Sequence, residues 1–431
     1  MILPGSPFFA MREGFLYAEE IPLADIAARF GTPCYVYSRA ALTENFSRYQ
    51  AALAAHPGGA EGLVCCAVKA NSGLAILNLF ARLGAGFDIV SGGELKRVLA
   101  AGGKADKVVF SGVGKSEAEM ELALNVGIFS FNVESASEME RLNRVAGRIG
   151  KIAPVSLRVN PDVDPKTHPY IATGLKTSKF GVSMREAPDL YARAAKLPNL
   201  AVRGIDCHIG SQITEPAPFA EALERLLDLM ARLEKEGINI HHLDLGGGLG
   251  IPYRMGETPL SIEDYLTPLL NRVQTRLGSS GRKCSIVLEP GRSLVGNAGL
   301  LLCKVEYLKT GAEKNFAIVD AAMNDLLRPA LYEAWHEILP VSPGQGATEA
   351  VYDVVGPVCE SGDFLGQDRK LAVTEGDCLA VLSAGAYGFA MSSNYNSRPR
   401  AAEVMVDGAD SILIRRRETA EELFALETRL P

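Results

Sequence analysis

Residues 64–101 read VCCAVKANSGLAILNLFARLGAGFDIVSGGELKRVLAA, and this stretch alternates short β-rich runs with helical patterns. Val64–Val68 and Phe87–Val90 predict strands, while Ala75–Leu83 and Gly93–Ala101 have the apolar spacing of amphipathic helices. The alternation continues to about residue 290 with six further predicted strands: Lys107–Ser111, Ile128–Asn132, Val155–Val159, Arg203–His208, His242–Gly246 and Ser285–Glu289. Strands separated by helices predict parallel pairing, and eight of them predict a closed (β/α)8 barrel of the TIM type.

The pattern changes after about residue 295, where strand signals follow one another without helices between them. These predicted strands are Gly299–Leu308, Phe316–Asp320, Val351–Val355, Lys370–Thr374, Cys378–Ser383, Ala402–Asp407 and Ser411–Arg415. They predict an all-β domain, a β-sandwich or barrel-like sheet, with a short closing helix at Thr419–Leu426. The N-terminal segment holds a strand candidate (Phe15–Ala18) and a helix (Pro22–Phe30) and is expected to complete this domain. We therefore expect a barrel over 36–290 and a β-domain made of 1–35 and 291–431.

Composition argues against several classes of function. The 431 residues include 44 basic and 51 acidic side chains, a net charge of −7, without a basic stripe, so we expect no nucleic-acid partner. No apolar run approaches the ~18–20 residues that cross a bilayer, and the start lacks a signal-peptide pattern, so we expect no membrane association. The eight cysteines form no C-x-x-C pair and predict reduced thiols in a cytoplasmic protein.

Polar or glycine-rich elements stand at nearly every predicted strand end, where barrels of this type place their chemistry. Lys69 follows the first strand; it either reaches solvent or, in a mostly apolar mouth, provides an amine for Schiff-base chemistry. The other ends carry Asp88, Ser91, Asn132, Arg158, His208 with Ser211, Gly246-Gly247-Gly248 and Glu289-Pro290-Gly291-Arg292. His241-His242-x-Asp244 is the only close group of histidines and a carboxylate, and neighbours on a strand point to opposite faces, so we expect no metal site.

The last two strand ends predict a site for a phosphorylated ring. Gly246-Gly247-Gly248 lets the backbone approach an anion, and a tight turn alone should not require three glycines in succession. The Gly291-Arg292 turn adds a second group of amides beside the first. Glu289 closes an apolar strand and needs a partner, either Arg292 or a protonated pyridine nitrogen such as that of pyridoxal phosphate. His208 is either a buried histidine in a turn or a ring that stacks on the cofactor.

The β-domain carries three further motifs: Arg328 and Tyr332 at i, i+4, Cys359-Glu360-Ser361 in a glycine-containing loop, and Ala386-Tyr387-Gly388. Four barrel motifs accompany them: Lys69-Ala-Asn, His208-Ile-Gly-Ser-Gln, Gly246-Gly-Gly-Leu-Gly and Glu289-Pro-Gly-Arg. Together they resemble the motifs of the fold-type III pyridoxal-phosphate decarboxylases. The match runs in consistent order from about residue 10 to the C-terminus.

The resemblance implies a role for each residue. Lys69 would hold pyridoxal 5′-phosphate covalently, His208 would stack on its ring, and Glu289 would hold the proton of the ring nitrogen. Further cofactor contacts would come from Asp88, Ser211, Gly246, Gly247, Gly248, Gly291, Arg292 and Tyr387. The amino-acid substrate would be held by Arg292, Arg328, Tyr332, Glu360 and Tyr387, and Cys359 would return a proton to the decarboxylated carbon. The resemblance also implies a homodimer in which Cys359 and Glu360 complete the partner subunit's site.

Within that family the chain most resembles the branch that converts meso-2,6-diaminopimelate to L-lysine and CO2, the last step of bacterial lysine biosynthesis. The distal end of this substrate carries a carboxylate, which arginines can pair with, and an ammonium, which Glu360 can pair with. The alternative is a decarboxylase for ornithine, arginine or carboxynorspermidine, and ornithine would have little use for two arginines. More remote alternatives are a racemase of the same fold and a catalytically silent regulatory homologue, which would be expected to lose Lys69 or the phosphate glycines.

Overall fold

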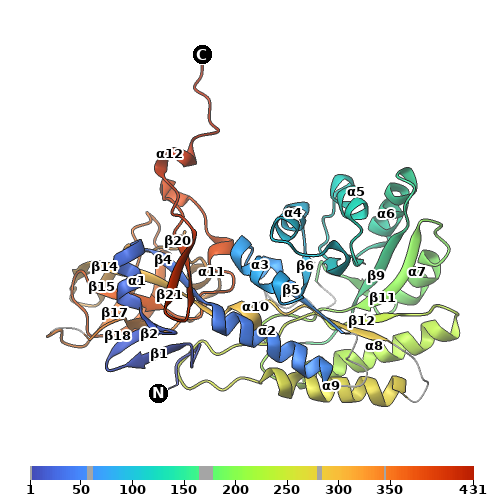
Figure 1. Ribbon diagram of the computed structural model, residues 1–431, viewed down its shortest axis with the longest axis horizontal. Helices are drawn as coiled ribbons and strands as arrows, with labels where there is room; N and C mark the ends of the chain where they lie inside the picture. Colours follow the sequence, from blue (N-terminus) through green and yellow to red (C-terminus); the bar gives the residue numbers. More distant parts are fainter. Residues whose placement is uncertain (1, 56–61, 165–177, 279–283, 344–345) are drawn as a thin grey trace. The chain divides into compact units, whose positions relative to one another are not determined.

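The computed structural model describes residues 2–55, 62–164, 178–278, 284–343 and 346–431. The chain forms two compact units, which we call the barrel unit and the sheet unit (Figure 1). The barrel unit comprises Asn45–Ile251 and Pro259–Ser293, and the sheet unit comprises Met1–Glu44, Pro252–Thr258 and Leu294–Pro431. None of the helices in the described ranges combines the length and the apolar composition of a membrane span.

Eight parallel strands close the barrel unit into a TIM-type barrel, which confirms the predicted fold. They are β5 (Leu63–Ala67), β6 (Gly86–Ile89), β7 (Val108–Phe110), β8 (Ser130–Val133), β9 (Ala153–Asn160), β11 (Leu200–Asp206), β12 (His242–Asp244) and β13 (Ser285–Leu288). The barrel closes where the last strand, β13, pairs with the first, β5, with Val287 opposite Leu63. A two-residue strand, β10 (Val182–Ser183), also pairs with β9; it was not predicted, because two residues are too few to show a period.

Helices follow the barrel strands and lie outside them (Figure 1). They are α3 (Leu74–Arg82), α4 (Gly92–Ala100), α5 (Glu117–Val126), α6 (Ala136–Arg148), α7 (Ala187–Ala194), α8 (Ala217–Lys235) and α9 (Ile262–Leu277). Four of them begin at a serine whose hydroxyl accepts a hydrogen bond from a backbone N–H three residues later: Ser91, Ser116, Ser135 and Ser261. This bond satisfies a donor that the first helical turn leaves free. Ser91, one of the polar residues at the strand ends, is therefore the N-cap of α4.

The sheet unit has a strand from the N-terminal segment at its centre. β4 (Cys34–Ser38) lies between β14 (Gly299–Lys309) and β20 (Ala402–Asp407). The sheet continues through β15 (Asn315–Val319), β17 (Ala350–Val355) and β18 (Phe364–Leu371) on one side and β21 (Asp410–Arg415) on the other, and β19 (Cys378–Val381) pairs with β14 and with β16 (Ile338–Pro340). A separate small sheet contains β1 (Phe9–Arg12), β2 (Phe15–Ala18) and β3 (Ile21–Pro22).

The core of the sheet unit is formed by the two ends of the chain together. Leu16 and the buried face of helix α1 (Leu23–Phe30) share one hydrophobic cluster with Leu300 of β14 and Val404 of β20. Burial of side chains of this size stabilises a fold by roughly 1.5–3 kcal/mol each. The N-terminal segment is thus an integral part of this unit.

Three details of the sheet unit differ from the prediction. β15 and β17 pair in parallel, so the chain must cross over between them, and this connection contains a short helix, α11 (Arg328–Tyr332). The predicted strand Lys370–Thr374 is misplaced, because β18 ends at Leu371 and Thr374 donates to Asp377 in a turn. The closing helix α12 covers only Ala420–Leu423, shorter than predicted.

Candidate active site

Lys69 lies directly after the first barrel strand, in a single 3-10 turn (Val68–Ala70). Its Nζ donates to Oδ2 of Asp88 at 2.5 Å, and Asp88 is fully buried in the neighbouring strand β6. The Lys69 side chain remains 36% exposed. The expectation of a mostly apolar environment is therefore wrong. A buried carboxylate instead holds the lysine amine at the carboxyl ends of β5 and β6.

His208 and the glycine turn after β12 are joined by a hydrogen bond. The Gly247 N–H donates to Nδ1 of His208 at 3.1 Å, so the imidazole carries its proton on Nε2. Burial, together with the charges of Arg158 and Lys69, lowers the pKa of His208 well below its usual range. The ring is therefore neutral at physiological pH and has a fixed orientation, as stacking on a planar ligand requires.

Crowding of the backbone alone accounts for all three glycines of this turn. A Cβ atom on Gly247 would lie 2.3 Å from the carbonyl oxygen of Glu289. Cβ atoms on Gly246 and Gly248 would each lie 2.6 Å from another backbone oxygen, and both residues have positive φ, +64° and +110°. The turn itself therefore requires all three glycines, so the prediction that it would not is wrong, and the motif alone is not evidence of an anion site.

Arg292 joins two of the loops that carry predicted phosphate ligands. It is buried at the start of α10 (Arg292–Val295), and its Nε and Nη2 donate to Oγ of Ser211 at 3.3 and 3.1 Å. Ser211 lies in the loop after β11, and Arg292 in the loop after β13. The neighbouring Gly291 packs closely against the turn that carries Lys69, since a Cβ there would lie 3.0 Å from Cβ of Ala70.

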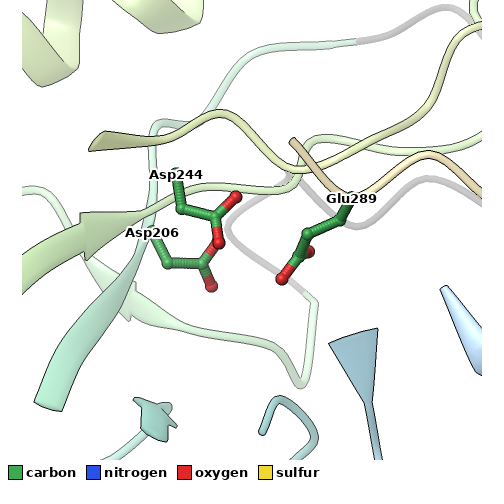
Figure 2. Close-up of side chains that lie close together, drawn as sticks. All are labelled: Asp206, Asp244 and Glu289. Carbon is green, nitrogen blue, oxygen red and sulfur yellow. The ribbon is translucent and has the colours of Figure 1, made fainter. Parts of the chain in front are cut away.

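Three buried carboxylates from adjacent strand ends, Asp206, Asp244 and Glu289, point toward one another (Figure 2). One oxygen of each lies within 4.8 Å of the others. Both oxygens of Asp206 and Oδ2 of Asp244 have no hydrogen-bond partner within the described part of the chain. Burial and the neighbouring Asp244 raise the pKa of Asp206 and of Glu289 well above the usual range, and burial raises the pKa of Asp244 to about 6.

Glu289 accepts a hydrogen bond from Nδ2 of Asn132 at 3.4 Å and otherwise faces mainly negative charge. After burial, Asp244, Asp88 and Asp206 all raise its pKa, whereas Lys69 lowers it. This environment favours a ligand with a positive charge or a proton to donate. A set of carboxylate oxygens is also what hard metal ions prefer, so these residues could hold a cation, which the sequence analysis did not expect.

The barrel residues fit pyridoxal phosphate. Lys69 provides an amine for its aldehyde, and Glu289 provides a buried acceptor for a protonated ring nitrogen. Asp88 Oδ1 and Asn132 Oδ1, both buried, have no hydrogen-bond partner among the residues that the structure describes, as expected where a polar ligand completes a site.

The remaining predicted site residues belong to the sheet unit. Arg328 and Tyr332 are the first and last residues of α11 and share one helix face, as their spacing predicts. Tyr387 is partly buried, with φ of +56°. Cys359 and Glu360 are exposed on a loop, where the Cys359 N–H donates to Oδ1 of Asn396 at 2.8 Å. Cys359 is thus accessible, whereas six of the eight cysteines are buried.

The chain is similar to known proteins along nearly its whole length. Residues 39–296 match the family model of the pyridoxal-binding domain of pyridoxal-dependent decarboxylases. Diaminopimelate decarboxylase of Pseudomonas aeruginosa is 60% identical over 423 residues, which cover 98% of this chain and 99% of the relative.

The chain belongs to the pyridoxal-dependent decarboxylase family.

Two solved structures agree with this membership of the pyridoxal-dependent decarboxylases. Diaminopimelate decarboxylase of Helicobacter pylori, complexed with L-lysine, is 41% identical with a TM-score of 0.88, covering 94% of this chain and 99% of that one. The enzyme of M. jannaschii in co-complex with L-lysine is 38% identical with a TM-score of 0.93, covering 99% of both chains. The cofactor of this family is pyridoxal phosphate, as the sequence analysis expected.

Two carboxylates of this decarboxylase barrel were not predicted from the sequence as site residues. Asp206 was not singled out, and Asp244 was considered only as a metal ligand beside the histidines. A signal was available, because Asp206 stands two residues before His208 and Asp244 two before Gly246. Residues two apart on a strand point to the same face, so this spacing places each carboxylate on the face that leads to a predicted site residue.

Proposed function

We propose that the chain is a diaminopimelate decarboxylase that releases CO2 from meso-2,6-diaminopimelate and forms L-lysine. The similarity to diaminopimelate decarboxylases over 98% of the chain, at 60% identity, carries this proposal. The Helicobacter pylori relative was solved with L-lysine, the expected product. The reaction is the last step of bacterial lysine biosynthesis.

Pyridoxal phosphate, when bound, supplies an electron sink for the electron pair that remains when CO2 leaves. Lys69 would provide the amine that holds the cofactor, and Asp88 orients that amine through the hydrogen bond at 2.5 Å. Glu289 would hold the proton of the ring nitrogen. His208, which is neutral, would stack on the ring without adding a positive charge.

The phosphate group would be held by donors from several loops. In the two glycine turns the backbone N–H groups of Gly248 and Gly291 are the candidates, because the N–H of Gly246 already donates to Asp244 and that of Gly247 to His208. Arg292, which donates to Ser211, adds a guanidinium, a group whose charge and geometry suit an anion. We assign the Tyr387 hydroxyl of the sheet unit to the same group.

The substrate is an amino acid at both ends, which sets the residues that select it. Arg292 and Arg328 would pair with carboxylate, and Glu360 with the distal ammonium. Tyr332 and Tyr387 would add hydroxyl contacts. Cys359 would donate its thiol proton to the carbon that has lost CO2, which completes the conversion to lysine.

We infer that the active enzyme is a homodimer in which each subunit lends Cys359 and Glu360 to the other. Their exposure in a single chain supports this inference. Lys69→Ala and Cys359→Ala should each be inactive. An equal mixture of the two that has exchanged subunits should regain about a quarter of wild-type activity, because about half of its dimers are mixed and each of these has one of its two sites intact. A mixture that remains inactive would contradict the shared site.

We also infer that the enzyme works in the cytoplasm. All eight cysteines are free thiols, which suits a reducing compartment.

The decisive experiment compares meso-diaminopimelate, ornithine, arginine and lysine as substrates of the pyridoxal-phosphate-loaded enzyme. We expect CO2 release and lysine formation with diaminopimelate at a kcat/KM far above that with the other three. A preference for ornithine or arginine would instead place the chain in the polyamine branch. Lys69→Ala, loaded in the same way, controls for decarboxylation by free cofactor.

A further inference from the structure

We propose that His336 is a positioning residue that fixes the guanidinium of Arg328 for the distal carboxylate of the substrate. This inference rests on the proposed function, because it takes Arg328 as one of the arginines that select diaminopimelate. His336 is fully buried in the sheet unit and was not singled out in the sequence. It contacts Arg328 and is itself held by the backbone.

The hydrogen bonds of His336 fix both its tautomer and its direction. Nη1 of Arg328 lies 2.9 Å from Nε2 of His336, and an arginine can only donate, so Nε2 is the acceptor. Nδ1 lies 2.8 Å from the carbonyl oxygen of Leu382, which can only accept, so Nδ1 carries the proton. The imidazole is therefore neutral, and each of its nitrogens has a role that a second proton would destroy.

The fold brings His336 back to Arg328 over a short stretch of chain. Helix α11 begins at Arg328 and ends at Tyr332, and the next residue, Glu333, has φ of +51° and caps it in the left-handed conformation. β16 then pairs with β19, and the Leu382 N–H donates to the Glu337 carbonyl at 2.8 Å. This pairing places the backbone of Leu382 next to His336. The imidazole is thus held between two short segments that directly adjoin the paired strands β16 and β19.

Tyr253 completes the support from another segment of the sheet unit. Its ring lies 4.8 Å below the Arg328 guanidinium and 5.2 Å from the His336 ring, at 83° to it. Both supports of the guanidinium, an imidazole nitrogen and an aromatic face, are neutral groups. These two contacts orient the side chain, and neither of them adds a negative charge beside it. Fixing a long side chain before binding also removes an entropy loss from the binding step.

Two variants separate the two hydrogen bonds of His336. His336→Gln places an amide oxygen near the position of Nε2 and can still accept from Arg328. His336→Asn places its amide near the position of Nδ1 and can still donate to Leu382, but it cannot reach Arg328. A residue that only fills space would be replaced equally well or equally badly by both amides.

The test measures kcat and KM for meso-diaminopimelate in wild type and both variants. We expect His336→Asn to raise KM about tenfold or more, as loss of a contact to a charged group implies, with little change in kcat. His336→Gln should stay within about threefold of wild type. Equal KM values in all three proteins, or equal losses in both variants, would overturn the inference. Wild-type turnover is recorded first, so a failure of the proposed function is seen before any variant is compared.

A second readout does not depend on activity. In 15N spectra of histidine-labelled protein, one imidazole should carry its proton on Nδ1, and its signals should be missing in His336→Gln. A His336 ring protonated on Nε2 would refute the assigned hydrogen bonds and with them the positioning role.

Discussion

We expect the cofactor-free barrel to be more stable in Asp244→Asn than in wild type, by a difference that grows as the pH rises. Asp244 lies directly opposite Asp206 in the pairing of β11 with β12, and its Oδ1 accepts the Gly246 N–H at 2.9 Å, a bond that an asparagine oxygen can keep. Burial raises the pKa of Asp244 from 3.8 to about 6. Between these two pKa values the folded protein keeps a proton that the unfolded chain has already released. The free energy of unfolding therefore falls as the pH rises, until Asp244 has lost its proton above about 6.

The pKa rise corresponds to about 3 kcal/mol in total, of which about 2 kcal/mol is lost between pH 4.5 and 7.5. An asparagine does not titrate and loses nothing over this range. Removing the Asp244 charge also lowers the pKa of Asp206 and Glu289, so these two groups cost the variant less stability than wild type as the pH rises. Relative to wild type, the variant should therefore gain at least about 2 kcal/mol, or roughly 30-fold in the opening equilibrium of the barrel, between these two pH values. The contributions of His208 and His242 are the same in both proteins and cancel in the comparison.

Hydrogen exchange followed by mass spectrometry resolves the barrel unit from the sheet unit. Peptides from β11, β12 and β13 of the cofactor-free proteins should show the relative gain in protection at the higher pH, and both proteins are compared at each pH so that intrinsic exchange rates cancel. Peptides of the sheet unit, and the fluorescence of Trp335, the only tryptophan, serve as internal controls. A difference between variant and wild type that is the same at pH 4.5 and 7.5 would refute the reasoning.

The remaining predictions concern cofactor, substrate and backbone. Lys69→Ala should abolish the visible absorption band of the loaded enzyme; a band of unchanged position and intensity would mean that another amine binds the cofactor. Glu360→Gln should raise KM for diaminopimelate about 10- to 150-fold, as loss of a charged hydrogen bond implies, and an unchanged KM would place the distal ammonium elsewhere. Gly247→Ala should lower the melting temperature and cofactor binding, because its Cβ would lie 2.3 Å from a Glu289 oxygen, whereas Gly114→Ala, with nothing within 4 Å, is the matched control and should change neither. Treatment with EDTA should leave decarboxylation unchanged, because Glu289 is assigned to the ring nitrogen; a loss that Mg²⁺ restores would favour a metal site.

The elements of the barrel could be predicted because each leaves a local signal. A strand such as Ile286–Leu288 is an apolar run followed by a polar strand end, and each helix shows its own period. The place of β4 between β14 and β20 could not be predicted in this way, because it depends on pairing between segments far apart in the chain. The N-terminal segment lacks the pattern of a barrel unit, but no local pattern identifies its partner strands.

The site shows the same difference between features with a local sequence signal and features that depend on strand pairing. Lys69, His208 and Glu289 could be named because each stands at the end of a recognisable strand. Their contacts depend on register: Ala67 lies opposite Asp88, which brings Lys69 to that carboxylate, and no spacing in the sequence reveals this. His336 left no signal either, because its role depends on the pairing of β16 with β19.

Register also explains why the barrel keeps three buried carboxylates that oppose its own stability. Asp206 lies opposite Asp244, and Asp244 opposite Val287, two residues before Glu289, so parallel pairing in this register brings the three groups together. Buried carboxylates without partners destabilise a fold, and structures retain such features mainly where function needs them. In the proposed function, a proton on the ring nitrogen of the cofactor would offset this cluster of charge, and the cluster would in turn favour the protonated ring. The residues that weaken the cofactor-free barrel are therefore the ones that should tighten its hold on the protonated cofactor.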